Sequence, residues 1–255
     1  MNQSLRNFRD YSISILGLLF FWWLASGPLQ MPIYLLPSPA DTFLAILELV
    51  LSGALWVHLG FTLQNLLLGL VTGTLAGVAV AYLWSRVPSL AFWLDGPMVI
   101  MQTAPKIALA PLFVVWFGFG VLSKVVLVFS LVFFPVFVSA VAGFKAIDYR
   151  LHDLSKLLDL SAKARFLHVE LPSALPAIFI GMRIGAVQAL VGAVLGEWMS
   201  GQWGLGYLMT YASATYQTPL LFAAVVLTVT LGILLHFALM WAENRLLSWK
   251  EVSND

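Results

Sequence analysis

Residues 143–183 read GFKAIDYRLHDLSKLLDLSAKARFLHVELPSALPAIFIGMR and form the longest polar interval of a very apolar chain. One apolar segment precedes this interval, and another begins within its last residues. Both ends are therefore expected at one membrane face, with the polar part between them in water. We predict that a separate component, which supplies energy to this protein, binds the chain at this interval.

The composition indicates a membrane protein. Of the 255 residues, 61% are hydrophobic and 10% are charged, and the mean hydropathy is +0.93. A soluble domain is roughly 45–50% apolar and about 25% charged. We predict an all-α, polytopic membrane helix bundle that forms a single domain over residues 1–255. The net charge of +1 points to no nucleic-acid partner, and the absence of cysteine excludes disulfides and thiolate metal sites.

Six apolar segments predict about six transmembrane helices. The first, residues 13–25, follows a basic start and precedes small residues, so a cleaved signal peptide is the alternative to a retained span. Trp22 and Trp23 are typical of a membrane interface and favour the retained span. The other five predicted spans are residues 59–84, 90–117, 125–144, 174–196 and 220–241.

An amphipathic helix is predicted between the first two spans, on the outer surface. Ser38 can cap its N-terminus, with Pro39 at the first helical position. The carboxylates Asp41 and Glu48 argue against the alternative, a short membrane span. Apolar residues follow helical spacing opposite these acids, at Phe43, Ile46, Leu47, Val50 and Leu51.

Two spans carry residues that constrain their packing. Gly69, Gly73 and Gly77 in the second span allow close approach of another helix. The third span is interrupted by three prolines, whose freed carbonyls must find partners in protein or water. Lys106 lies in the same span, where an ammonium is costly and faces the bundle interior or a cavity. It either snorkels or pairs within the bundle, or it belongs to a transport pathway.

The distribution of Lys and Arg predicts the orientation. If odd-numbered spans lead outward, ten of the thirteen basic residues fall on one side. The loops 28–58 and 198–219, on the other side, contain no Lys or Arg. The positive-inside rule therefore places both termini and the loop 145–170 in the cytoplasm. The ten are Arg6, Arg9, Arg86, Lys145, Arg150, Lys156, Lys163, Arg165, Arg245 and Lys250.

The sequence lacks the common motifs for nucleotide binding, hydrolysis and metal binding. The sequence has no GxxxxGK[ST] phosphate loop, no HExxH, no GxSxG and no histidine pair at ligand spacing. This argues against an intramembrane enzyme and leaves a channel, a secondary carrier or the membrane half of a larger machine. In the loop 145–170, leucines and a phenylalanine interleave with charges at near-helical spacing. They fit either a groove on a partner or the membrane surface.

The end of the opening interval resembles the cytoplasmic coupling loop of ABC importer permeases. Leu171-Pro172, Ala174-Leu175-Pro176 and Gly181-Met182-Arg183 match the distal half of that loop. The proximal half departs from the family, with Asp159 at its Gly position and Ser155-Lys156-Leu157 read at its Glu-Ala-Ala position. The Gly position calls for a turn with positive φ, which Asp tolerates better than most residues.

Further segments resemble the nitrate/sulfonate/taurine branch of these permeases, and the resemblance extends from about residue 35 to about residue 245. They are PSP (37–39), APKIA (104–108), WFGFG (116–120) and GLGYL (204–208). Within the branch, GAVLGEW (192–198), with Gln217-Thr218 and FAA (222–224), is most similar to permeases for the pyrimidine precursor of thiamine. The resemblance thus implies an aminopyrimidine as substrate, with sulfonate, taurine or nitrate next.

The same resemblance implies an importer in the bacterial inner membrane. Its parts would be a second copy of this chain, cytoplasmic ABC ATPase subunits that hydrolyse ATP, and an external solute-binding protein. It implies no cofactor, no metal and no catalytic residue in this chain. The implied ATPase contacts are Asp153, Ser155, Lys156, Leu157, Asp159, Ser161, Arg165 and Phe166, and the implied pathway residues are Gln102, Thr103 and Lys106.

The alternative hypothesis is a self-sufficient secondary carrier or channel. Charged residues at membrane depth motivate it, namely Lys106, Arg183 and Glu197. For Arg183 we favour a structural role, as an ion pair with Glu197 or with an acid of the loop.

Overall fold

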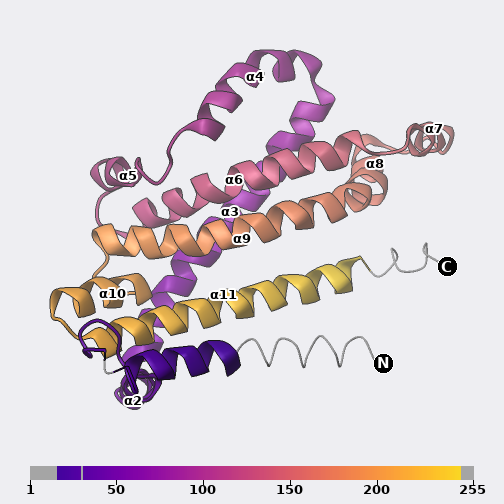
Figure 1. Cartoon of the computed structure of the whole chain (residues 1–255). Coiled ribbons are helices and arrows are strands. Elements are labelled where there is room, and N and C mark those ends of the chain that lie inside the picture. Colours follow the sequence, from indigo (N-terminus) through magenta and orange to yellow (C-terminus); the bar gives the residue numbers. More distant parts are fainter. Residues whose placement is uncertain (1–15, 30, 248–255) are drawn as a thin grey trace, which may run out of the picture.

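The computed structural model describes residues 16–29 and 31–247, and within these ranges it contains helices and turns but no strand (Figure 1). The predicted all-α polytopic membrane bundle is confirmed. Four helices in the described part of the chain are long and apolar enough to cross a membrane. They are α3 (Ala54–Arg86), α6 (Val121–Lys145), the helical run Ala162–Met199 that contains most of α9 (Leu171–Ser200), and α11 (Thr218–Leu246).

The first and third predicted spans are not single helices of this kind. The first is a short apolar helix, Leu16–Ser26, and its predicted start at residues 13–15 lies outside the described residues. The third is divided into α4 (Pro88–Thr103) and α5 (Ala110–Phe117). Pro105 explains the break, because a proline disfavours helical geometry at the residue before it. Ala104 accordingly has an extended backbone, with φ −55° and ψ 135°.

α6 lies at the centre of the bundle, between α3 and α9. Its Val128, Val132 and Val136 are fully buried, and they fill the space that glycines on both neighbours leave. A Cβ placed on Gly69 of α3 would lie 2.3 Å from Cγ1 of Val128, so a larger residue there would force the helices apart. The predicted role of the glycine row in helix packing is confirmed, since Gly73 and Gly77 also face α6.

The amphipathic helix is confirmed as α2 (Pro39–Leu51). The Ser38 hydroxyl accepts from the Asp41 amide at 3.1 Å, and the Ser38 amide donates to the Asp41 carboxylate at 3.2 Å. Together these bonds form a capping box, with Pro39 at the first helical position. The apolar face remains exposed in the chain, with Leu51 at 77% and Phe43 at 64%, as expected for a helix that lies against lipid.

The two ends of the bundle differ in character. Figure 1 shows the short helices α7 (Tyr149–Leu157) and α8 (Ala162–Arg165) at one end, and α2 with α10 (Leu205–Ala214) at the other. The π-helical turn η1 (Phe166–Glu170) joins α8 to α9. The polar loop 145–170 thus lies at one end of the molecule, between the end of α6 and the start of α9.

Candidate functional site

α7 is the exposed helix of the polar interval. The Asp148 carboxylate caps it by accepting from the Arg150 amide at 2.9 Å. Ser155 is buried at 2% exposure, so this side of α7 faces the protein. The other side carries a row of exposed apolar side chains, in which Leu154 is 50%, Leu157 84% and Leu158 62% exposed. An apolar patch of this kind on an exposed helix fits either of the two expected surfaces, a groove on a partner or the membrane surface.

α7 ends in a Schellman motif, a common way to stop a helix. The Leu160 amide donates to the Ser155 carbonyl at 3.1 Å, and the Asp159 amide donates to the Lys156 carbonyl at 3.0 Å. Asp159 has φ +48°, in the left-handed region that glycine adopts most easily. The predicted positive φ at the family's Gly position is therefore confirmed.

The spacing of the family motif requires a correction to our alignment. The family pattern has three residues between Glu-Ala-Ala and Gly, so Asp159 at the Gly position aligns Asp153-Leu154-Ser155 with Glu-Ala-Ala, not Ser155-Lys156-Leu157. The structure fits this register, because Ser155 then stands at the last Ala position and is buried. Asp153 retains the acid in a shorter form and pairs with Lys156 at 3.4 Å on the exposed surface.

Asp159→Gly is expected to stabilise the end of α7 by about 0.5–1 kcal/mol. A non-glycine residue costs about 1–2 kcal/mol in left-handed backbone, and glycine removes this cost. Part of the gain is lost because glycine gives the unfolded chain more conformational entropy. The measurement is the rate of trypsin cleavage after Lys156 and Lys163, which should fall. Asp153→Gly, inside α7, is the matched control and should raise the rate. Faster cleavage in Asp159→Gly would contradict the expected strain.

The residues after α7 turn inward. Ser161 caps α8 by accepting from the Ala164 amide at 3.2 Å. The Phe166 ring lies 4.6 Å from that of Tyr82 in α3, between ring centroids. Phe166 therefore packs against the bundle, and Arg165 reaches toward Glu170. Of the predicted ATPase contacts, Asp153, Lys156, Leu157, Asp159 and Ser161 are exposed, while Ser155 is buried and Arg165 and Phe166 are only partly exposed.

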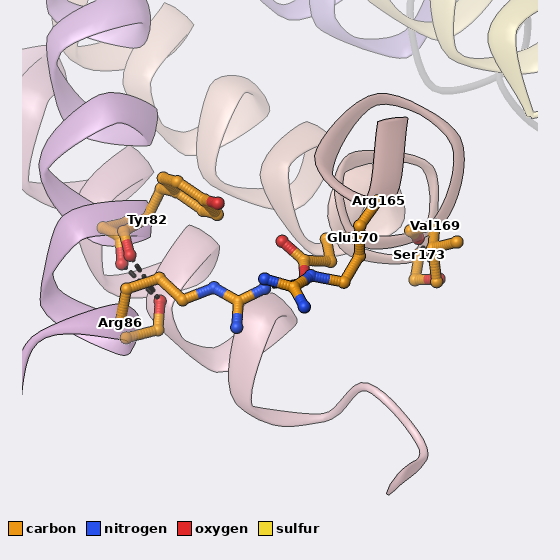
Figure 2. A network of polar contacts seen from close by, with 8 residues as sticks. Tyr82, Arg86, Arg165, Val169, Glu170 and Ser173 are labelled. Carbon is orange, nitrogen blue, oxygen red and sulfur yellow. Dashed lines mark hydrogen bonds and ion pairs between the residues drawn. The ribbon is translucent and has the colours of Figure 1, made fainter. Parts of the chain in front are cut away.

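Glu170, which sequence reasoning did not select, ties the loop to α3. Its side chain is 1% exposed and forms ion pairs with Arg86 and with Arg165, the latter at 3.1 Å. Figure 2 shows the two arginines converging on it from α3 and from α8. The Arg86 guanidinium also lies 5.6 Å from the centre of the Tyr82 ring. Movement of α8 and η1 is thereby linked to the end of α3.

The α4–α5 break borders a cavity of about 350 Å³ with a largely apolar wall and a few polar side chains. Two of the three predicted pathway residues, Gln102 and Lys106, line it, together with Ser139 and Gln188 from α6 and α9. Lys106 Nζ donates to the Gln102 carbonyl at 2.8 Å and lies 4.6 Å from the centre of the Phe134 ring. The Thr103 hydroxyl instead donates to carbonyls of its own helix.

A buried polar cluster lies at the opposite end from α7. Glu197 is fully buried, and its carboxylate accepts from the Thr62 hydroxyl at 3.0 Å, the Asn65 amide at 3.2 Å and the Gly206 backbone N–H at 2.9 Å. Gly204 lies beside it with φ +120°, and a Cβ on Gly204 would come within 2.2 Å of Glu197 Cδ. The turn before α10 therefore requires glycine, and Glu197 holds it against α3.

Arg183 has a different partner from those predicted. It forms an ion pair with Glu243, near the end of α11, and pairs neither with Glu197 nor with an acid of the loop. Helix geometry explains the outcome: α9 and α11 pack side by side, while Glu197 is about four turns further along α9. The pair crosslinks two long helices.

Comparison with known proteins accounts for these features together. Residues 69–248 match the family model described as "Binding-protein-dependent transport system inner membrane component". The "Probable ABC transporter permease protein" of Haemophilus influenzae is 37% identical over 230 residues, 89% of this chain and 92% of its own. The formylaminopyrimidine transport permease protein ThiX of Halalkalibacterium halodurans is 33% identical, covering 94% and 95% of the two chains. The taurine transport system permease protein TauC of Escherichia coli is 30% identical, covering 91% and 86%.

These matches confirm the resemblance to ABC importer permeases of the nitrate/sulfonate/taurine type, with a thiamine-precursor permease among the relatives. A subunit of this kind is a multi-pass component of the inner membrane and not an enzyme; it works with ATPase and solute-binding partners. The family match covers most of the chain, from the glycine row of α3 to the end of α11. The chain belongs to the family of binding-protein-dependent transport system inner membrane components.

Proposed function

We propose that this chain is the permease of an importer for an aminopyrimidine precursor of thiamine. The support is the similarity of residues 192–198, 217–218 and 222–224 to such permeases and the 33% identity to ThiX over almost the whole chain. An organic sulfonate, taurine or nitrate is the next candidate, because TauC is similar over nearly as much of the chain. In the assembly, two copies of this chain enclose the pathway, and an external binding protein delivers the substrate.

The ATPase binds α7, and the motion that ATP drives in the ATPase is transmitted to the chain there. The exposed apolar side of α7 is the observation that carries this proposal. Leu154 and Leu157 dock into a groove of the ATPase, as amphipathic helices do in partner grooves. Closure of the ATPases moves α7, and the motion reaches α9 through the helical run Ala162–Met199. Glu170 passes it to α3 through Arg86. The π-turn η1 interrupts regular α-helix at the junction and is the place where bending is easiest.

The substrate passes the cavity beside the α4–α5 break. Backbone that is not helical is tolerated at membrane depth where it lines a cavity, and Gln102 and Lys106 offer polar groups there. Thr103 lies on the same segment and belongs to the same pathway. The end with α7 faces the cytoplasm, together with both termini, because the described residues at that end include the basic side chains of Arg86, Lys145, Arg150, Lys156, Lys163 and Arg165.

Reconstitution in liposomes tests the function. The chain, its ATPase and its binding protein should take up a radiolabelled aminopyrimidine in an ATP-dependent manner, and uptake should exceed that of taurine at equal concentration. Greater uptake of taurine would overturn the substrate. Uptake by the chain alone, driven by an ion gradient, would instead establish a secondary carrier.

A further inference from the structure

A second cavity, of about 240 Å³, lies next to the buried Glu197 cluster. It lies at the end of the bundle away from α7, between the start of α6, the N-terminal half of α3 and the turn before α10. Its wall includes Phe61, Asn65, Phe119, Lys124, Gln202 and Trp203, and no carboxylate among the described residues lines it.

Two buried polar groups in the wall have hydrogen-bonding capacity beyond their bonds in the protein. Lys124 is 7% exposed, and its ammonium donates to the carbonyls of Phe119 and Gly120, both at 3.3 Å. An ammonium has three donors, so one is left for a ligand. Asn65 is 1% exposed and donates to Glu197, while its Oδ1 has no partner among the described residues. Such a buried acceptor costs free energy unless a ligand or water satisfies it.

The remaining wall is aromatic. Trp203 stacks on Phe61, with ring centroids 6.2 Å apart and planes inclined by 16°. Trp203 is 48% exposed and stands on the turn before α10, so its ring can be approached from outside the bundle. Flat aromatic walls bind planar ring systems through stacking.

We propose that this cavity is a binding site of the permease itself, for a small, planar, amino-substituted nitrogen heterocycle. The exocyclic amine of such a ligand donates to Asn65 Oδ1, a ring nitrogen accepts from Lys124, and the ring stacks on Trp203. An anion without a ring would use only Lys124, and an apolar ring would leave the Asn65 carbonyl unsatisfied. The assignment to the outer face rests on the proposed orientation, whereas the ligand class follows from the wall of the cavity.

Equilibrium binding of radiolabelled 4-aminopyrimidine to the chain in its complex with the ATPase, in lipid nanodiscs and without the binding protein, tests the site. Trp203→Leu should weaken binding at least about tenfold, the effect of removing one stacking partner. Trp198→Leu is the matched control, because Trp198 is equally exposed at 47% and does not line the cavity. Its affinity should equal that of the unmodified chain.

Two further measurements probe the polar groups. Pyrimidine, which lacks the amine, should bind at least about tenfold more weakly than 4-aminopyrimidine, since the Asn65 carbonyl stays unpaired. Lys124→Met should weaken binding of 4-aminopyrimidine at least about tenfold, because the ring nitrogen loses its charged donor, and the thermal midpoint of this variant is measured alongside. The site would be overturned if 4-aminopyrimidine did not bind. It would also be overturned if Trp203→Leu bound 4-aminopyrimidine as tightly as the unmodified chain, or if pyrimidine bound as tightly as 4-aminopyrimidine. If the importer takes up aminopyrimidine in an ATP-driven manner but the cavity binds none, only the proposed site is overturned. If the cavity binds aminopyrimidine but the importer takes up none, only the proposed function is overturned.

Discussion

Glu197→Leu is expected to destabilise the protein by about 3–5 kcal/mol and to release the turn before α10. The substitution leaves the Asn65 amide and the Gly206 N–H without an acceptor in a fully buried site. Each stranded donor costs about 1–3 kcal/mol. Thr62 loses less, because its hydroxyl can donate to the His58 carbonyl, 3.2 Å away. The Lys124 ammonium also loses a nearby negative charge. The measurement is the thermal unfolding midpoint of the purified chain.

Two variants separate this effect from a general change of charge. Glu197→Gln keeps the shape and one carbonyl acceptor, so it should cost about 1–3 kcal/mol, less than Leu. Glu48→Gln neutralises an exposed carboxylate on α2 and should leave the midpoint unchanged. A midpoint for Glu197→Leu equal to that of Glu48→Gln would show that the cluster does not hold α3, α9 and the turn before α10 together.

The double variant Leu154→Glu/Leu157→Glu is expected to abolish measurable ATPase association and ATP-driven uptake. Burial of one leucine side chain contributes about 1.5–3 kcal/mol, so loss of two weakens association by at least about a hundredfold. Both side chains are exposed in the chain, at 50% and 84%, so the fold should survive. The measurement is recovery of the ATPase with the tagged permease from mixed detergent extracts, followed by uptake in liposomes.

The control for this variant is Leu35→Glu, which places the same charge on an exposed leucine at the opposite end of the molecule. It should retain full ATPase association. A double variant that recovers as much ATPase as Leu35→Glu would remove α7 from the proposed coupling surface. The docking would then have to use another part of the polar end.

Local sequence signals predicted much of this fold. The capping box of Ser38 and Asp41, the close-packing glycine row of α3 and the left-handed backbone at Asp159 all depend on residues within a few positions of one another, although the partner of the glycine row, α6, was not predicted. Apolar length predicted α3, α6, α9 and α11, because spanning a bilayer requires about twenty apolar residues regardless of their neighbours. The broken third span was recognisable as proline-rich, but the position of the break was not predicted.

The polar clusters could not be predicted in the same way. Glu197 meets Thr62 and Asn65 across 135 and 132 residues of chain, and Glu170 meets Arg86 across the whole of α4, α5 and α6. Arg183 was recognised as a structural cation, yet its partner Glu243 was not, since the pairing depends on how α9 and α11 lie against each other.

Hydropathy, charge bias and short motifs therefore determined that this chain is a polytopic permease with a polar loop at one end, because these properties act along the chain or across a bilayer. Tertiary structure alone decided which side of α7 is exposed, which carboxylates are buried and which side chains line each cavity. Those outcomes depend on the rotation and depth of packed helices, and a one-residue rotation of about 100° exchanges a buried position for an exposed one.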